Sequence, residues 1–163
     1  MEQLASRRSF FQSMAAATFT IATVAGNAQA STDNDRMALE KTFAAIRAGF
    51  AMGDVASVMK YHHPQVRKAL SFDKVLVGSD AVAADLSSVF KEFRIEFVKD
   101  QLESLLIERD TAIEQSLFTI EGTPLHGQAP FVITGRSMVV YVRYPKSPTG
   151  WASIREIVRP ASE

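Results

Sequence analysis

The residues best suited to proton transfer in this sequence are Tyr61, His62 and Glu114. A histidine has an ordinary pKa close to neutrality, so His62 can act as an acid or a base. Its alternative role is a favourable interaction with a helix dipole, because the segment that contains it is expected to end a helix. Glu114 and Gln115 alternate on an expected strand, so one of them faces inward. Burial of Glu114 would raise the pKa of its carboxyl group and suit it to acid–base chemistry, whereas its alternative place is solvent or a subunit edge.

Metal ligands are sparse, since the chain has 3 histidines and no cysteine. His62 and His63 are adjacent, so on a helix their side chains point about 100° apart and cannot hold one ion together. The third histidine, His126, lies in an expected loop. The sequence also has no glycine-rich phosphate loop and no nucleophile elbow. We therefore predict no metal site and no cofactor.

Two arginines on neighbouring expected strands, Arg136 and Arg155, are candidates for ligand binding. Both faces of the strand around Arg136 are substantially apolar, which indicates that it is covered on each side. An inward Arg136 would anchor an anion or a carbonyl, and an outward one would form an interfacial salt bridge. Arg155 has the same two alternatives, and Glu156 takes the inward place if the register shifts by one residue.

Apolar periodicity places helices before strands. Leu39, Phe43, Ile46 and Phe50 recur at helical spacing, which predicts a helix from about Asp35 to Met52. Gly53 and Asp54 end it, and Asp54 caps a second helix over 55–62. A third helix is expected over 80–93, and 66–77 reads as irregular or short strand structure.

From residue 94 the apolar period changes to two, which predicts strands over 95–108, 112–121, 131–144 and 151–158. Short connections between such strands favour antiparallel pairing. The predicted fold class is α+β, with three N-terminal helices packed in the concave face of a strongly curved antiparallel sheet, a cone-shaped α+β barrel.

Three segments resemble elements of the nuclear transport factor 2-like superfamily, which includes ketosteroid isomerase, scytalone dehydratase and the SnoaL-like cyclases. They are Phe43–Asp54, Val77–Phe90 and Gly150–Pro160, and the resemblance covers essentially all of 35–160. It implies a bent sheet that wraps the long helix and leaves a pocket at its open end. In such a cone the expected ligand-binding residues are Phe43, Ile46, Phe50, His62, Arg136, Val140 and Arg155.

The isomerase chemistry of that superfamily does not transfer to this chain. The resemblance places the isomerase tyrosine at Ile46, its base near Leu70 and its second acid near Val140, and all three residues are apolar. Asp73 is close enough to serve as base if the alignment slips, but nothing else in the sequence supports that role.

The first 30 residues read as a cleaved export leader. The stretch Ser6–Gln12 resembles the twin-arginine export motif, a mildly apolar run follows over Met14–Ala25, and Ala28–Ala30 suits a signal peptidase. The alternative is an amphipathic first helix of the fold. We expect cleavage near Ala30, a single domain over 31–163, and a periplasmic or secreted location in a bacterium. Without cysteine, the chain has neither disulfides nor a lipid-anchor site.

The charges indicate which partners to expect. With 18 basic and 18 acidic residues and no basic cluster, the sequence argues against nucleic acid. We expect a homodimer through the sheet, because six side chains give more apolar area than one small cone needs: Phe118, Ile120, Phe131, Ile133, Tyr141 and Trp151. Trp151 is alternatively a core residue, which is the preferred interpretation.

The leading hypothesis is an exported, homodimeric protein that binds a small apolar or amphipathic molecule. The alternative is an isomerase, lyase or cyclase that transfers protons through Tyr61, His62 or Glu114. A third possibility is an interaction module without catalysis, whose cone is filled by side chains. An open cavity would exclude the third hypothesis, and an inward acid–base pair would favour the second.

Overall fold

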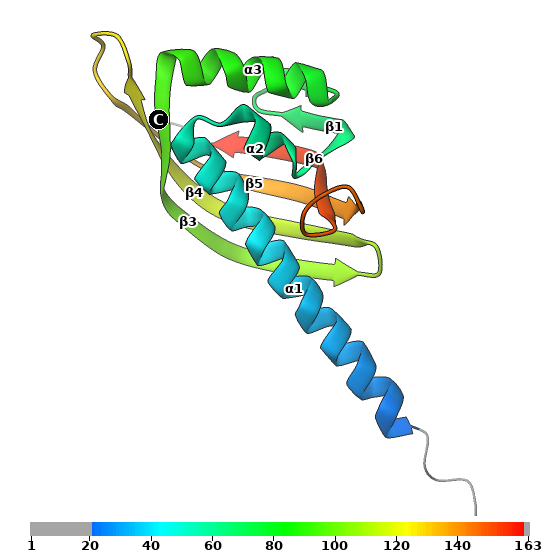
Figure 1. The fold of residues 1–163 in the computed structure, drawn as a ribbon. Coiled ribbons are helices and arrows are strands. Elements are labelled where there is room, and N and C mark those ends of the chain that lie inside the picture. The colour runs from blue at the N-terminus through cyan, green and yellow to red at the C-terminus, as the bar shows by residue number, and fades with distance from the viewer. Residues whose placement is uncertain (1–20, 162–163) are drawn as a thin grey trace, which may run out of the picture.

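The helices come first along the chain and the long strands follow, as the sequence predicts (Figure 1). The computed structural model describes residues 21–161, with side chains from residue 32 onward. The helices are α1 (Ile21–Met52), α2 (Val55–Met59) and α3 (Ser79–Glu92). The strands are β1 (His62–Ala69), β2 (Val75–Val77), β3 (Phe93–Glu108), β4 (Thr111–Pro124), β5 (Phe131–Arg143) and β6 (Trp151–Pro160).

Helix α1 begins earlier than its apolar stripe predicts, at Ile21 instead of Asp35. The intervening stretch is rich in alanine, the residue with the highest helix propensity. The twin-arginine motif lies outside the described residues. Gly53 takes a positive φ of 66° at the end of α1, and the Asp54 side chain accepts a hydrogen bond from the Ser57 amide at 3.0 Å. The predicted cap of the second helix is therefore confirmed.

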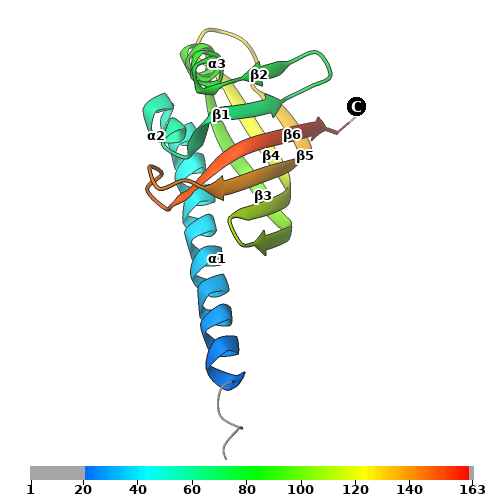
Figure 2. The same cartoon turned by 90° about the vertical axis from the view of Figure 1, so that its right-hand side faces the viewer.

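Six strands form one curved, unclosed sheet in the order β2-β1-β6-β5-β4-β3. Neighbouring strands pair antiparallel except β1 and β6, which are parallel. Register shifts interrupt β3 twice and the β5–β6 pair once, and such bulges increase strand bending. In Figures 1 and 2 the sheet curves around α1, while α2 and α3 lie over one end of its concave side. This arrangement confirms the predicted α+β cone.

Two apolar clusters fix the helices on the sheet. The first joins α1 to β4, β5 and β6 through Leu39, Phe43 and Trp151, among others. Trp151 is fully buried, as the preferred interpretation holds, and the Arg143 guanidinium lies over its ring at 4.2 Å. The second cluster joins α2, α3 and β1 through Val58, Val66, Val82 and Leu86. The space between the two clusters is not filled.

Candidate ligand cavity

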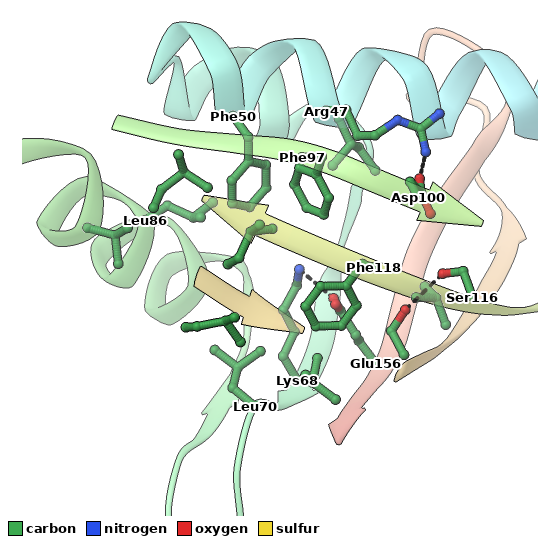
Figure 3. Close-up of a pocket in the computed structure, with 18 of the residues that line it drawn as sticks. Arg47, Phe50, Lys68, Leu70, Leu86, Phe97, Asp100, Ser116, Phe118 and Glu156 are labelled. Carbon is green, nitrogen blue, oxygen red and sulfur yellow. Dashed lines mark hydrogen bonds and ion pairs between the residues drawn. The ribbon is translucent and has the colours of Figure 1, made fainter. Parts of the chain in front are cut away.

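A cavity of about 430 Å³ lies between the concave face of the sheet and helices α1 and α3 (Figure 3). Every strand from β1 to β6 contributes to its wall. Most of the wall is apolar, and seven aromatic rings face it: Phe43, Phe50, Phe93, Phe97, Phe118, Phe131 and Tyr141. A cavity of this size and lining matches those that bind small molecules.

Strand alternation determines which side chains reach the cavity. On β4, every second residue from Glu114 to Ile120 lines it, and Gln115 points to the opposite face. Glycine makes room for the rings, since a Cβ on Gly135 would lie 2.8 Å from the Phe118 ring. Elsewhere in the wall, the rings of Phe50 and Phe97 meet edge to face at 5.5 Å, and this contact fixes α1 against β3.

A polar group lies within this apolar wall, where Glu114 and Tyr141 face each other across β4 and β5. The Tyr141 hydroxyl donates a hydrogen bond to Glu114 Oε2 at 3.1 Å, and both residues are buried. Burial raises the pKa of Glu114, although hydrogen bonds from Ser116 and Tyr141 partly offset that rise. Burial and the adjacent carboxyl raise the pKa of Tyr141 as well, so its hydroxyl stays a donor at neutral pH.

The other charged side chains of the wall form ion pairs. Lys68 Nζ lies 2.6 Å from Glu156 Oε2, and Lys74 Nζ lies 2.6 Å from Asp85 Oδ1. Arg47 on α1 pairs with Asp100 on β3, as Figure 3 shows. Although burial alone would raise the pKa of Glu156, the Lys68 ammonium beside it holds that pKa below its ordinary value. These pairs cancel their own charges inside the cavity.

Several predicted site residues do reach the cavity. Phe43, Ile46 and Phe50 line it from α1, where their helical spacing places them on one face. Glu114 lines it from β4, so the inward member of the Glu114–Gln115 pair is the carboxylate. Ile46 and Leu70 give the wall apolar side chains at two of the positions that the isomerase fills with reactive ones.

Tyr61 and His62 lie elsewhere, which corrects their assignment as cavity residues. Helix α2 ends at Met59, so His62 does not end a helix but begins β1. Its ring is buried outside the cavity wall, and Nδ1 donates to the Val58 carbonyl at 3.0 Å. Burial, with the Lys68 charge nearby, lowers the pKa of His62 to about 3. This neutral core histidine is a poor candidate for acid–base chemistry.

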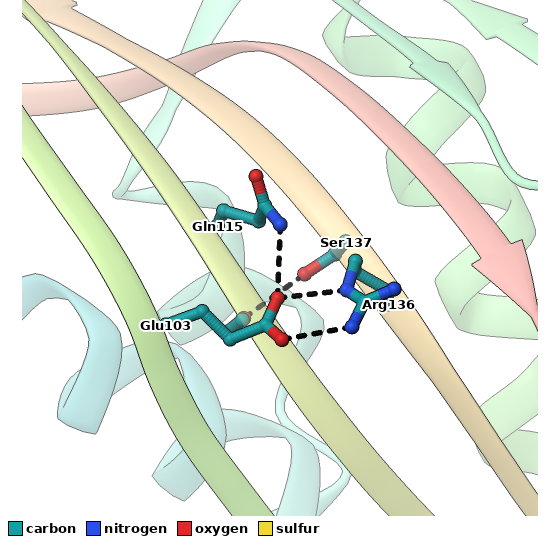
Figure 4. Close-up of polar contacts among 5 residues, drawn as sticks. Glu103, Gln115, Arg136 and Ser137 are labelled. Atoms are coloured by element: carbon teal, nitrogen blue, oxygen red, sulfur yellow. Dashed lines mark hydrogen bonds and ion pairs between the residues drawn. The ribbon is translucent and has the colours of Figure 1, made fainter.

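Arg136, Val140 and Arg155 lie on the convex face, so their assignment to the cavity was wrong. Arg136 is exposed and forms a bidentate ion pair with Glu103, at 2.7 and 2.8 Å (Figure 4). Gln115 donates to the same carboxylate at 2.9 Å. The inward positions belong to the next residue along each strand, which for Arg155 is Glu156.

Sequence reasoning also placed some residues on the wrong face and missed others. Five of the six side chains expected at a dimer face line the cavity: Phe118, Ile120, Phe131, Ile133 and Tyr141. The missed residues include Lys68, because its segment was read only as irregular or short strand structure. Alternation of Val66, Lys68 and Leu70 could have placed all three on one strand face.

Some features are absent from the part of the chain that the structure describes. No group of three or more histidine, cysteine or carboxylate side chains lies together as a metal site within residues 21–161. Among the helices over the same residues, none is long and apolar enough to cross a membrane.

Solved structures match this arrangement in fold, although no family profile and no curated protein matches the sequence. A conserved protein from Planctomyces limnophilus aligns with 18% identity and a TM-score of 0.70, over 78% of this chain and 98% of that one. A nuclear transport factor 2-like superfamily protein from Salmonella enterica aligns with 13% identity and a TM-score of 0.64, over 82% and 94%.

A ketosteroid isomerase-like protein from Erwinia carotovora atroseptica aligns with 16% identity and a TM-score of 0.62, over 76% and 94%. The chain has the nuclear transport factor 2-like fold. At these identities the likeness covers the fold alone, and one such fold hosts unrelated activities. What this cone does must therefore be argued from its own cavity.

Proposed function

We propose that this protein binds a small, mostly apolar molecule inside the cone. The observation that supports this function most directly is the cavity itself, with about 430 Å³ of space and an aromatic wall. Apolar pockets of this size with a few placed polar groups are typical binding sites. Side chains do not fill the cone, which argues against a module that acts only through its outer surface.

A second candidate function is acid–base catalysis at Glu114. It is favoured by a buried carboxyl group in the cavity wall, whose pKa burial raises, with the Tyr141 hydroxyl 3.1 Å away. Such a carboxyl can take a proton from a bound substrate and return it. This candidate now rests on Glu114 and Tyr141 instead of Tyr61 and His62. Of the two functions, binding needs fewer assumptions because it requires the cavity alone.

The proposal includes export and self-association. The leader motif and the small residues at 28 and 30 support cleavage after Ala30 and a periplasmic or secreted protein. A convex sheet face with exposed Leu106, Met138 and Ile157 supports a second copy of this chain as the partner.

Native mass spectrometry of the full-length gene product, expressed in an exporting bacterium and recovered from its periplasm, tests these statements together. We expect a chain that begins at Ser31, a dimer mass, and additional mass from a co-purified small molecule. Gentle denaturation should release that molecule for identification. A protein that is recovered empty, and that binds no apolar dye afterwards, would contradict the binding function.

A further inference from the structure

The charges in the cavity wall do not balance. Three basic side chains line it, and each has a carboxylate of its own: Lys68 with Glu156, Lys74 with Asp85, and Arg47 with Asp100. Glu114 is the fourth carboxylate, and no basic side chain in the described residues forms an ion pair with it. The cavity therefore has one negative charge in excess when Glu114 is ionised.

Burial raises the pKa of Glu114, but the hydrogen bonds that it receives favour its anion. Tyr141 donates to Oε2, and the Ser116 hydroxyl also lowers the pKa of Glu114 by hydrogen bonding. Donors aimed at a carboxyl group favour its charged form. Both are neutral hydroxyls, so they solvate the charge without cancelling it. A bound group that carries a positive charge would complete the pairing.

One aromatic side chain contacts the same carboxyl group, and a second ring packs against it. The Phe43 and Tyr141 rings lie 5.2 Å apart, and the Tyr141 hydroxyl contacts Glu114 directly. Aromatic faces attract ammonium groups through their quadrupole, and the attraction is larger where water is excluded. A carboxylate in contact with one of two packed rings thus favours an ammonium ion over a neutral hydroxyl or an anion.

From this arrangement we infer that the ligand is a ring-bearing, mainly apolar amine. Its ammonium group binds Glu114, and its rings lie against the phenylalanines on the β3 side of the cavity. The inference rests on the proposed binding function and specifies its ligand class. The other polar groups of the wall bind each other, so one amine satisfies the one unpaired charge. A carboxylate ligand would instead meet Glu114 as a like charge.

Displacement of a fluorescent dye tests the inference on the intact protein. The neutral dye N-phenylnaphthylamine reports occupancy of the apolar cavity, and three competitors share one ring system: naphthylmethylamine, naphthylmethanol and naphthoate. At pH 7 we expect the amine to bind about tenfold more tightly than the alcohol, because a charged hydrogen bond replaces a neutral one. Naphthoate should be the weakest of the three.

Glu114→Gln keeps the size of the side chain and removes its charge, so the amine preference should fall to within about twofold while the dye still binds. Glu121→Gln makes the same change at an exposed site of the same strand, outside the cavity wall, and should keep the preference. Equal binding of amine and alcohol to the unaltered protein would overturn the inference but leave the binding function standing. A dye that does not bind the unaltered protein would overturn both the inference and the binding function. Both of these outcomes are measured on the unaltered protein, so they do not depend on whether a variant folds.

Discussion

His62 and Glu114 are both buried titratable side chains, but their surroundings give them different roles. His62 packs beside Val58 outside the cavity, where burial lowers the pKa of its ring to about 3. Glu114 faces the cavity, where burial raises its pKa and two hydroxyls stabilise its anion. The first residue therefore matters for stability, and the second for the binding that we propose.

The buried histidine makes stability depend on pH. The folded-state pKa of His62 lies below its unfolded value of 6.5, so its contribution is complete above that value and is lost as pH falls. Between pH 6.5 and about 4 we expect the free energy of unfolding to decrease by about 1.4 kcal/mol per pH unit from this residue. Urea unfolding at several pH values measures this slope.

His62→Gln should flatten the slope, because glutamine does not titrate and its amide can still donate to the Val58 carbonyl. The control is His63→Gln, at the adjacent and less buried position, which should leave the slope unchanged. An unaltered slope in His62→Gln would show that another group titrates there.

At the residue scale, the sequence predicted which side chains share a face but not which face is inward. Arg136, Met138 and Val140 do lie together, as alternation requires. Both faces of β5 are apolar, so composition could not distinguish the cavity side from the convex side. For the same reason, the sequence could not decide whether Glu114 or Gln115 faces inward. The strand register in the structure decides it.

At the element scale, the close packing of α1 on α2 depends on Gly49. A Cβ at this position would lie 2.6 Å from Val58 Cγ2 and 3.2 Å from the Val58 backbone nitrogen. On an open helix face, replacing glycine with alanine stabilises by roughly 1 kcal/mol. We expect the opposite sign here, a loss of about 2 kcal/mol from Gly49→Ala, because α2 has to move.

Equilibrium unfolding in guanidinium chloride measures that loss. The matched test is a double-mutant cycle with Val58→Ala, which removes the contacting methyl group. Gly49→Ala should cost less in the Val58→Ala background than in the native one. An increase in stability from Gly49→Ala alone would mean that the two helices are not packed so closely.

Element boundaries were predictable where local patterns decide them. The strands from β3 to β6 match their predicted ranges within a few residues because turn residues separate them. The segment of strand β1 was read as irregular or short strand structure from residue 66, and the end of α2 was placed three residues too late. Both errors have one cause, since β1 is held by parallel pairing with β6 at the far end of the sequence. Local periodicity does not contain that pairing.

For the whole molecule, the question is what covers the convex face. Phe118, Phe131 and Tyr141, which were expected there, line the cavity instead, and the face carries smaller apolar side chains among charged ones. Leu106 and Ile157 are 60% and 61% exposed, and Ile157 lies beside Met138 in the sheet register. A second copy of the same face would remove these side chains from water.

Ile157→Lys tests this interface directly. A lysine at the centre of the face would be buried without a partner, so we expect the dimer dissociation constant to rise about a hundredfold. Light scattering coupled to size-exclusion chromatography reads the mass across a concentration series. Met52→Lys, at an exposed apolar site at the end of α1 on the opposite side of the sheet, makes the same charge change away from the face and should remain dimeric. A dimer that survives Ile157→Lys would place the contact on another surface. If the monomeric variant still binds the dye, each cone binds its ligand without the partner.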